Sequence, residues 1–257
     1  MVDGRKLRPN ATNPRGRLMN SIKATAHRAG ALYFVFMIVA IVGEFLIPGF
    51  LVAGDAAATA RNIVADGLAY RMDILVGFVT LILFLFLIVS LYRLFEDIDK
   101  SLARLMALLV SVGVAISLAN MLCKLAPLVL LSGADYLSVF TKPQRDALVL
   151  GFLMLHRSGA AFSMAFWGLW LFPFGMLVIK SGYFPRILGI LLMVAGFAYL
   201  TSSVASMVLP EYRSVVSRVM MPLYFGEVPI VFWLLIKGAT RRQPESGPAM
   251  PPEPAVP

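Results

Sequence analysis

Residues 72–92 read MDILVGFVTLILFLFLIVSLY, and Asp73, at the second position, is the only charged residue among them. A helix of about 20 apolar residues crosses the hydrocarbon core of a bilayer, which is about 30 Å thick. The length and composition of this stretch therefore predict a membrane-spanning helix.

Five further stretches share this character. Together they give six predicted crossings, at residues 29–47, 72–92, 105–131, 158–179, 185–208 and 219–237. Of the 257 residues, 59% are hydrophobic and only 14% are charged, and the mean hydropathy is +0.81. This composition excludes a soluble fold. We predict an all-α polytopic membrane protein whose six transmembrane helices form one domain, residues 29–238.

A tail flanks this domain on each side, and we predict that both are disordered. Residues 1–28 carry seven bases against one acid, and residues 239–257 are rich in proline. A basic tail without a soluble domain is typical of contact with anionic lipid headgroups, not of a nucleic-acid surface. The lipid bilayer is therefore the expected partner, and no nucleic-acid partner is expected.

The distribution of Lys and Arg predicts the orientation. With the N-terminus inside, the cytoplasmic segments hold 15 of the bases and the outer segments hold 7. Cytoplasmic loops carry the excess of basic residues in membrane proteins. Both termini are therefore predicted to be cytoplasmic.

Two of the outer loops are expected to contain short amphipathic helices. In the first loop, Asp55 is a suitable N-cap for a helix over residues 56–66, with Gly67 as its left-handed stop. In the third loop, Thr141 and Gln144 form a capping-box pattern. A helix from there to Ile179 would be about 57 Å long. It must protrude, tilt, or break at Gly151, Gly159 or Pro173.

Polar residues inside the predicted crossings are the candidate site. Charged side chains are costly in lipid, so we expect them to face the bundle interior. We predict a polar cavity that opens outward, lined by Glu44, Asn120, Lys124, His156, Arg157 and Glu227. The structural alternative is a set of ion pairs that only fixes the helix register. In either case Lys124 is expected to pair with Glu44 or Glu227, whereas Asp73 is expected at the headgroup rim.

Glu227 has the most unusual local sequence, PLYFGEVP over residues 222–229. Two prolines and a glycine interrupt a helix and free backbone carbonyls near the membrane centre. We therefore predict a broken helix beside a carboxylate, an arrangement typical of sites in membrane transport proteins. An ordinary proline kink is the alternative. In the fifth crossing, Gly189, Gly196 and Ser203 predict a face for close helix packing.

The sequence lacks the residues that several kinds of metal, haem and enzyme site require. One cysteine and two histidines, which are predicted at opposite membrane faces, provide neither a cysteine metal motif nor a bis-histidine haem site. The nucleotide-binding and hydrolase motifs are absent from the sequence. We therefore predict no catalytic residues, metal or cofactor, and we favour a role other than catalysis.

Several segments are familiar: AGDAAATARNIVAD (53–66), LLSGADYLSVF (130–140), LHRSGAAFSMAFWGLW (155–170), KSGYFPRILGILLMVAGFAYL (180–200) and GEVPIVFWLLIKG (226–238). The chain resembles the uncharacterised bacterial integral membrane family named domain of unknown function 4386. The resemblance implies a multi-helix protein of a bacterial inner (plasma) membrane, without an established activity or cofactor. The family's LH and GE pairs fall on Leu155-His156 and Gly226-Glu227.

Two functional hypotheses follow. The first is a bundle that binds or senses a small polar solute. The alternative is a small-solute or proton-coupled transporter that uses Glu227 and His156. The sequence does not identify the solute or the oligomeric state.

Overall fold

The computed structural model describes residues 14–45 and 49–240, and side chains from residue 19 onward apart from residues 44 and 45. Every regular element in these ranges is helical, which confirms the all-α class. In chain order they are α1 (Pro14–Phe45), α2 (Ala56–Ala65), α3 (Gly67–Phe95), α4 (Lys100–Leu130), η1 (Asp135–Val139), α5 (Lys142–Leu169), α6 (Leu171–Ser181), α7 (Arg186–Val208), η2 (Pro210–Tyr212), α8 (Arg213–Tyr224), η3 (Phe225–Glu227) and α9 (Val228–Ile236).

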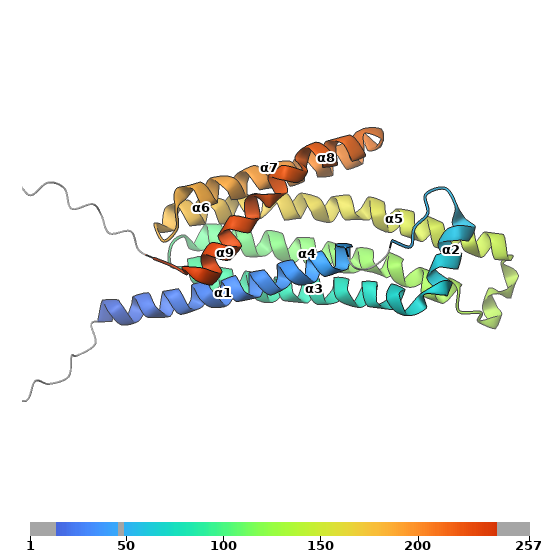
Figure 1. Cartoon of the computed structure of the whole chain (residues 1–257), viewed down its shortest axis with the longest axis horizontal. Helices are drawn as coiled ribbons and strands as arrows, with labels where there is room; N and C mark the ends of the chain where they lie inside the picture. The colour runs from blue at the N-terminus through green and yellow to red at the C-terminus, as the bar shows by residue number, and fades with distance from the viewer. Residues whose placement is uncertain (1–13, 46–48, 241–257) are drawn as a thin grey trace, which may run out of the picture.

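Six helical segments of the described chain are long and apolar enough to cross a membrane. They are Met19–Gly43, Gly67–Phe95, Lys100–Leu130, Lys142–Ser181, Arg186–Val208 and Pro210–Ile236. The prediction of six crossings is thus confirmed. The start of α1 and the end of α9 lie at the same end of the bundle, as an even number of crossings requires (Figure 1). Helix α2 lies across the opposite end (Figure 1).

The first helix begins earlier than predicted. Residues 14–28, expected to belong to a disordered tail, are part of α1. They are helical because this end of α1 packs on the end of α9: Ala26 is fully buried, and His27 Nδ1 lies 2.9 Å from the carbonyl oxygen of Leu235. The disorder predicted for residues 1–13 and 241–257 concerns residues outside the described part of the chain.

The helix predicted in the first outer loop is present, but its predicted stop is wrong. Asp55 caps α2 by accepting a hydrogen bond from the backbone N–H of Ala58 at 2.8 Å. Helix α2 ends at Ala65, and Gly67 is the first residue of α3. The carboxylate of Asp66 accepts from the backbone N–H of Ala69 at 3.0 Å. Because Asp66 caps the next helix directly, the turn needs no left-handed glycine.

The loop between α4 and α5 holds only the five-residue turn η1, because the helix expected there is the first part of α5 and belongs to the fourth crossing. Gln144 Oε1 accepts from the backbone N–H of Thr141 at 2.8 Å, as a capping box requires. From there α5 runs directly into the fourth crossing. The helix breaks at Trp170, between α5 and α6. Pro173 explains this position, because a proline cannot donate a hydrogen bond to the carbonyl four residues earlier.

The last crossing changes its neighbour part-way, at the predicted break. Helix α8 packs on α7, whereas α9 packs on α1, and the short turn η3 joins them across this gap (Figure 1). Gly226 allows η3 to approach α7, because a Cβ atom there would lie 2.5 Å from the carbonyl oxygen of Leu191. Glu227, the last residue of η3, is thereby placed between α1 and α7.

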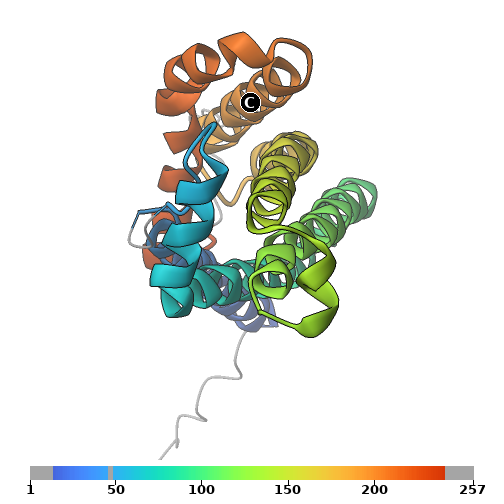
Figure 2. The same cartoon turned by 90° about the vertical axis from the view of Figure 1, so that its right-hand side faces the viewer.

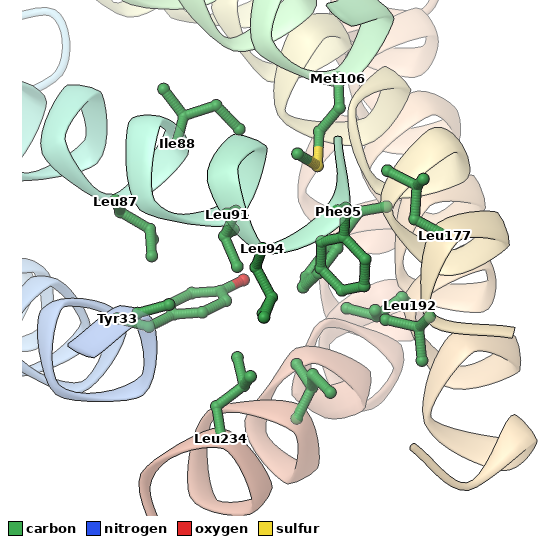
Figure 3. Packing of buried hydrophobic residues seen from close by; sticks show 14 of the residues in the cluster. Tyr33, Leu87, Ile88, Leu91, Leu94, Phe95, Met106, Leu177, Leu192 and Leu234 are labelled. Atoms are coloured by element: carbon green, nitrogen blue, oxygen red, sulfur yellow. The ribbon is translucent and has the colours of Figure 1, made fainter. Parts of the chain in front are cut away.

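Apolar side chains from six helices form the main core at the end of the bundle that holds the start of α1. Figure 3 shows Tyr33 of α1, Leu91 and Phe95 of α3, Met106 of α4, Leu177 of α6, Leu192 of α7 and Leu234 of α9 converging. A second cluster, which includes Phe50, Ile63, Tyr70 and Leu137, closes the end where α2 lies.

Helix α7 packs closely through small residues, as predicted. A Cβ atom at Gly189 would lie 2.5 Å from the carbonyl oxygen of Gly175, and one at Gly196 would lie 2.9 Å from that of Gly168. Ser203 Oγ donates to the carbonyl oxygen of Ala161 at 2.7 Å. These contacts hold α7 against α5 and α6.

Candidate functional site

A cavity of about 500 Å³ lies inside the bundle, between the two cores. Its walls come from α1, α3, α4, α5, α7, η3 and Trp170. Figure 2 views the bundle from the end where α2 lies, with α7 and α8 at the top and α3 at the bottom. The polar residues of the wall are Asp73, Thr80, Ser117, Asn120, Lys124, His156, Ser163, Tyr199 and Glu227.

Four of the six predicted cavity residues line this space: Asn120, Lys124, His156 and Glu227. Arg157 does not, because its side chain is exposed on the outside of α5. Glu44 belongs to the last turn of α1, and its side chain lies outside the described part of the structure.

Lys124 forms an ion pair with Asp73 across α3 and α4. The expected pairing of Lys124 with Glu227 is therefore wrong, and the side chain of Glu44, the other expected partner, lies outside the described part of the structure. These side chains remain 19% and 21% exposed, which is consistent with their position on the cavity wall. Tyr70 supports the pair by donating its hydroxyl hydrogen to the carbonyl oxygen of Lys124 at 2.8 Å.

The sequence contained the signal for this pair. Asp73 lies 20 residues before Arg93, and Lys124 lies 20 residues after Arg104. Because α3 and α4 are consecutive antiparallel helices joined by a short loop, equal spacing from that loop puts both residues at the same depth, about 30 Å away.

His156 and Asn120 join α5 to α4 through two hydrogen bonds. Asn120 Nδ2 donates to the carbonyl oxygen of His156 at 2.9 Å, and His156 Nδ1 lies 3.1 Å from the carbonyl oxygen of Asn120. A carbonyl oxygen only accepts, so Nδ1 carries the hydrogen and Nε2 is the ring nitrogen left to contact a solute. Gly159 makes room for this contact, since a Cβ atom there would clash with Asn120 Oδ1.

Glu227 lies at the aromatic end of the cavity. Tyr33 donates its hydroxyl hydrogen to Glu227 Oε2 at 2.6 Å. The residues are 194 positions apart and meet because α9 crosses to α1 immediately after η3. Within residues 14–45 and 49–240, the ion pairs are Lys124–Asp73, Lys142–Asp146 and Lys180–Asp99, and none includes Glu227.

Aromatic rings form the wall beside Glu227. Phe84 lies 5.3 Å from Trp170, 5.0 Å from Trp167 and 4.8 Å from Phe36 between ring centroids. The ring of Tyr33 lies 6.4 Å from that of Trp170. The sequence analysis did not predict that Trp167 and Trp170 would lie on this wall.

Ser163 is a further polar group that the sequence did not reveal. Its side chain lines the cavity, the residue is only 3% exposed, and its Oγ has no hydrogen-bond partner among the described residues. A buried hydroxyl without a partner is costly, so it is available to a bound molecule or water. In the described part of the chain, no three His, Cys, Asp or Glu side chains gather as a metal site.

These features define an α-helical polytopic integral membrane protein with a polar cavity in its bundle. The chain belongs to the family described as Domain of unknown function (DUF4386), which matches residues 28–238. This match confirms the resemblance seen in the sequence.

The comparisons with individual proteins add one relative. An uncharacterized protein of the archaeon Archaeoglobus fulgidus is 40% identical over 73 residues, which is 28% of this chain and 42% of that protein. This chain therefore spans less than half the length of that relative. No solved structure matches the chain significantly.

Proposed function

We propose that this protein binds a small polar solute inside its bundle. The observation that carries the proposal is the cavity itself, where charged and polar groups from five elements, α3, α4, α5, α7 and η3, face one space of about 500 Å³. Ligand pockets in proteins have volumes of about 300–1,000 Å³ and combine apolar walls with a few polar groups.

The energetic cost of placing charged and polar groups inside a membrane also supports a binding role. A charged residue inside a membrane costs about 2.5–3.5 kcal/mol at the centre of a lipid-facing helix, and residues that carry this cost commonly mark a pathway or a ligand site. Asp73 and Lys124 offset each other's charge, as the register-fixing alternative requires. That alternative does not account for Ser163 or Glu227. Among the described residues, Ser163 Oγ has no hydrogen-bond partner and Glu227 has no cationic partner.

Tryptophan fluorescence in lipid nanodiscs provides the test. The chain has three tryptophans, and two of them, Trp167 and Trp170, line the cavity. In a Trp233→Phe protein, all tryptophan emission therefore comes from the cavity wall. We expect at least one member of a panel of neutral, cationic, anionic and zwitterionic small solutes to change this emission saturably.

Two matched variants test whether the change in emission comes from binding inside the cavity. Ala160→Phe fills the cavity and should abolish the saturable change. Ala119→Phe adds the same volume on an exposed position of α4 and should preserve it. The proposal fails if no solute gives a saturable change, or if the Ala160→Phe protein responds as the unfilled protein does.

A transporter is the second candidate, and the broken helix at η3 favours it. Secondary transporters commonly bind their substrate beside interrupted helices near the middle of the membrane. Uptake of the bound solute into proteoliposomes distinguishes the two functions. A transporter accumulates or exchanges the solute, whereas a receptor binds it without net movement.

The proposed orientation places both termini in the cytoplasm and the α2 end of the bundle outside. The excess of bases at the termini and at the loops on their side supports it. The cavity then opens outward, in the plasma membrane of a prokaryotic cell.

A further inference from the structure

Among the described residues of the cavity wall, the ionised carboxylate of Glu227 is one negative charge without a cationic partner. Asp73 and Lys124 form an ion pair, so their charges cancel. His156, with a hydrogen on Nδ1 and a free Nε2, contributes none in its neutral form. The carboxylate of Glu227 remains. A solute with a positive charge is therefore the one that this wall neutralises.

The described residues do not provide a cation for Glu227. Lys124 lines the same cavity but is held by Asp73. Arg157, expected in the cavity, is exposed outside it. The hydroxyl of Tyr33 hydrogen-bonds to Glu227, but it carries no positive charge. Because an unpaired carboxylate is costly inside a bundle, a bound cation would offset part of the cost of ionised Glu227.

The walls near Glu227 suit an organic cation better than a metal ion. Hard metal ions require several oxygen ligands, and the described residues gather no three acidic or metal-binding side chains. Instead, Glu227 shares its cavity with Phe84, Trp167, Trp170 and Tyr199. Ammonium groups are attracted to the faces of aromatic rings, most strongly to tryptophan. An acid beside several aromatic rings is typical of sites that bind ammonium ligands.

We propose that the solute is an organic ammonium cation, whose charged group lies between the Glu227 carboxylate and the rings of Phe84, Trp167 and Trp170. The polar part of the same molecule reaches toward Ser163 and the His156–Asn120 pair. This inference rests on the proposed solute-binding function and specifies its substrate class.

The test uses three probes of the same shape and different charge. Choline carries a quaternary ammonium group, 3,3-dimethylbutan-1-ol is its neutral carbon isostere, and 3,3-dimethylbutanoate is an anion of similar shape. Two larger quaternary ammonium ions, tetraethylammonium and benzyltrimethylammonium, are included because a larger solute fills more of the cavity than choline does. Binding is measured by the emission of the Trp233→Phe protein in nanodiscs. We expect saturable binding of at least one cation, tighter by about tenfold or more than that of the neutral and anionic probes.

Substitution of the acid gives the second arm. Glu227→Gln keeps the shape but removes the charge, and it should weaken cation binding about tenfold or more while leaving any weak binding of the neutral probe unchanged. Asp99→Asn removes an acid outside the cavity and should not alter cation binding. If the Glu227→Gln protein does not fold, Glu227→Asp replaces it and should keep the preference for cations.

The outcomes separate the two proposals. If neutral or anionic solutes bind and no cation binds more tightly, the inference is overturned while the solute-binding function stands. Undiminished cation binding by the Glu227→Gln protein also overturns it. If no solute of any charge binds, the solute-binding function itself fails, and this inference fails with it.

Discussion

Single residues in this protein differ in how completely their charges are compensated. Lys124 and Asp73 compensate each other on the cavity wall, whereas Glu227 receives a hydroxyl hydrogen from Tyr33 but contacts no cation among the described residues. We expect the first arrangement to stabilise the bundle, and we propose that the second serves ligand binding. Substitutions at the two places should therefore have different effects.

Lys124→Met should destabilise the protein because it leaves Asp73 without its cation. Removing one partner of a largely buried pair costs about 2 kcal/mol or more. Unfolding in mixed micelles measures this change. The double substitution Asp73→Asn with Lys124→Met should recover part of the loss, because no charge is then left unpaired. Lys100→Met, which removes an exposed side chain that takes part in none of the ion pairs of the described residues, is the control and should cost less. Equal losses for the two lysine variants would contradict this prediction.

Asp99 gives the protein a defined pH dependence outside the membrane. The hydrogen bond from Lys180 Nζ, at 2.8 Å, and then the backbone N–H of Leu102 hold the pKa of Asp99 below its ordinary value. A lowered carboxyl pKa adds stability above the ordinary value, about pH 4, and this stability is lost as the pH falls through the lowered value. Asp99→Asn keeps a capping side chain and removes the charge.

We therefore expect the Asp99→Asn protein to be less stable than the unsubstituted protein at neutral pH. The difference should disappear in strong acid, where Asp99 is protonated. Thermal unfolding across this pH range provides the measurement. A difference that stayed constant with pH would show that the Asp99–Lys180 pair is not its source.

At the scale of helices, sequence patterns predicted the helix ends and breaks that depend on residues close together in the sequence. Pro222, Gly226 and Pro229 indicated the break in the last crossing, and Asp55 indicated the start of α2. The patterns did not predict which helices would be neighbours. Tyr33 meets Glu227 only because the chain leaves α7 after α8 and η3, and α9 then packs on α1. No local pattern in the sequence reports such a change. For the same reason the aromatic wall of the cavity was missed.

Substitution at Gly189 tests the close packing of α7. In Gly189→Val, the new side chain meets the backbone of Gly175, where a Cβ atom would lie at 2.5 Å. Overpacking of this kind costs about 1–3 kcal/mol. The loss should appear as a lower unfolding temperature in nanodiscs. Gly151→Val is the control, since its Cβ atom would meet no atom within 4 Å. If both variants unfold at the same temperature, the glycine contacts do not hold α7 in place.

At the scale of the whole molecule, six crossings place the two ends of the described chain on one side of the membrane. The excess of bases predicts that this side is the cytoplasm. Reporter fusions after Thr240 should therefore report the cytoplasm, and fusions within α2 should report the opposite side. Two reporters on the same side would contradict six crossings, and a consistent reversal would contradict only the orientation.

The account as a whole depends on a water-accessible cavity inside a membrane bundle. Ser117 lines that cavity, and Ala119, two residues further along α4, is exposed and lies outside it. In a Cys123→Ser background, each position is replaced by cysteine, and the rate of reaction with a small water-soluble thiol reagent is measured in proteoliposomes. Thiols react as thiolates, which form in water and not in lipid. The account predicts that Ser117→Cys reacts readily and that Ala119→Cys does not. An unreactive Ser117→Cys, or equal rates at the two positions, would contradict it.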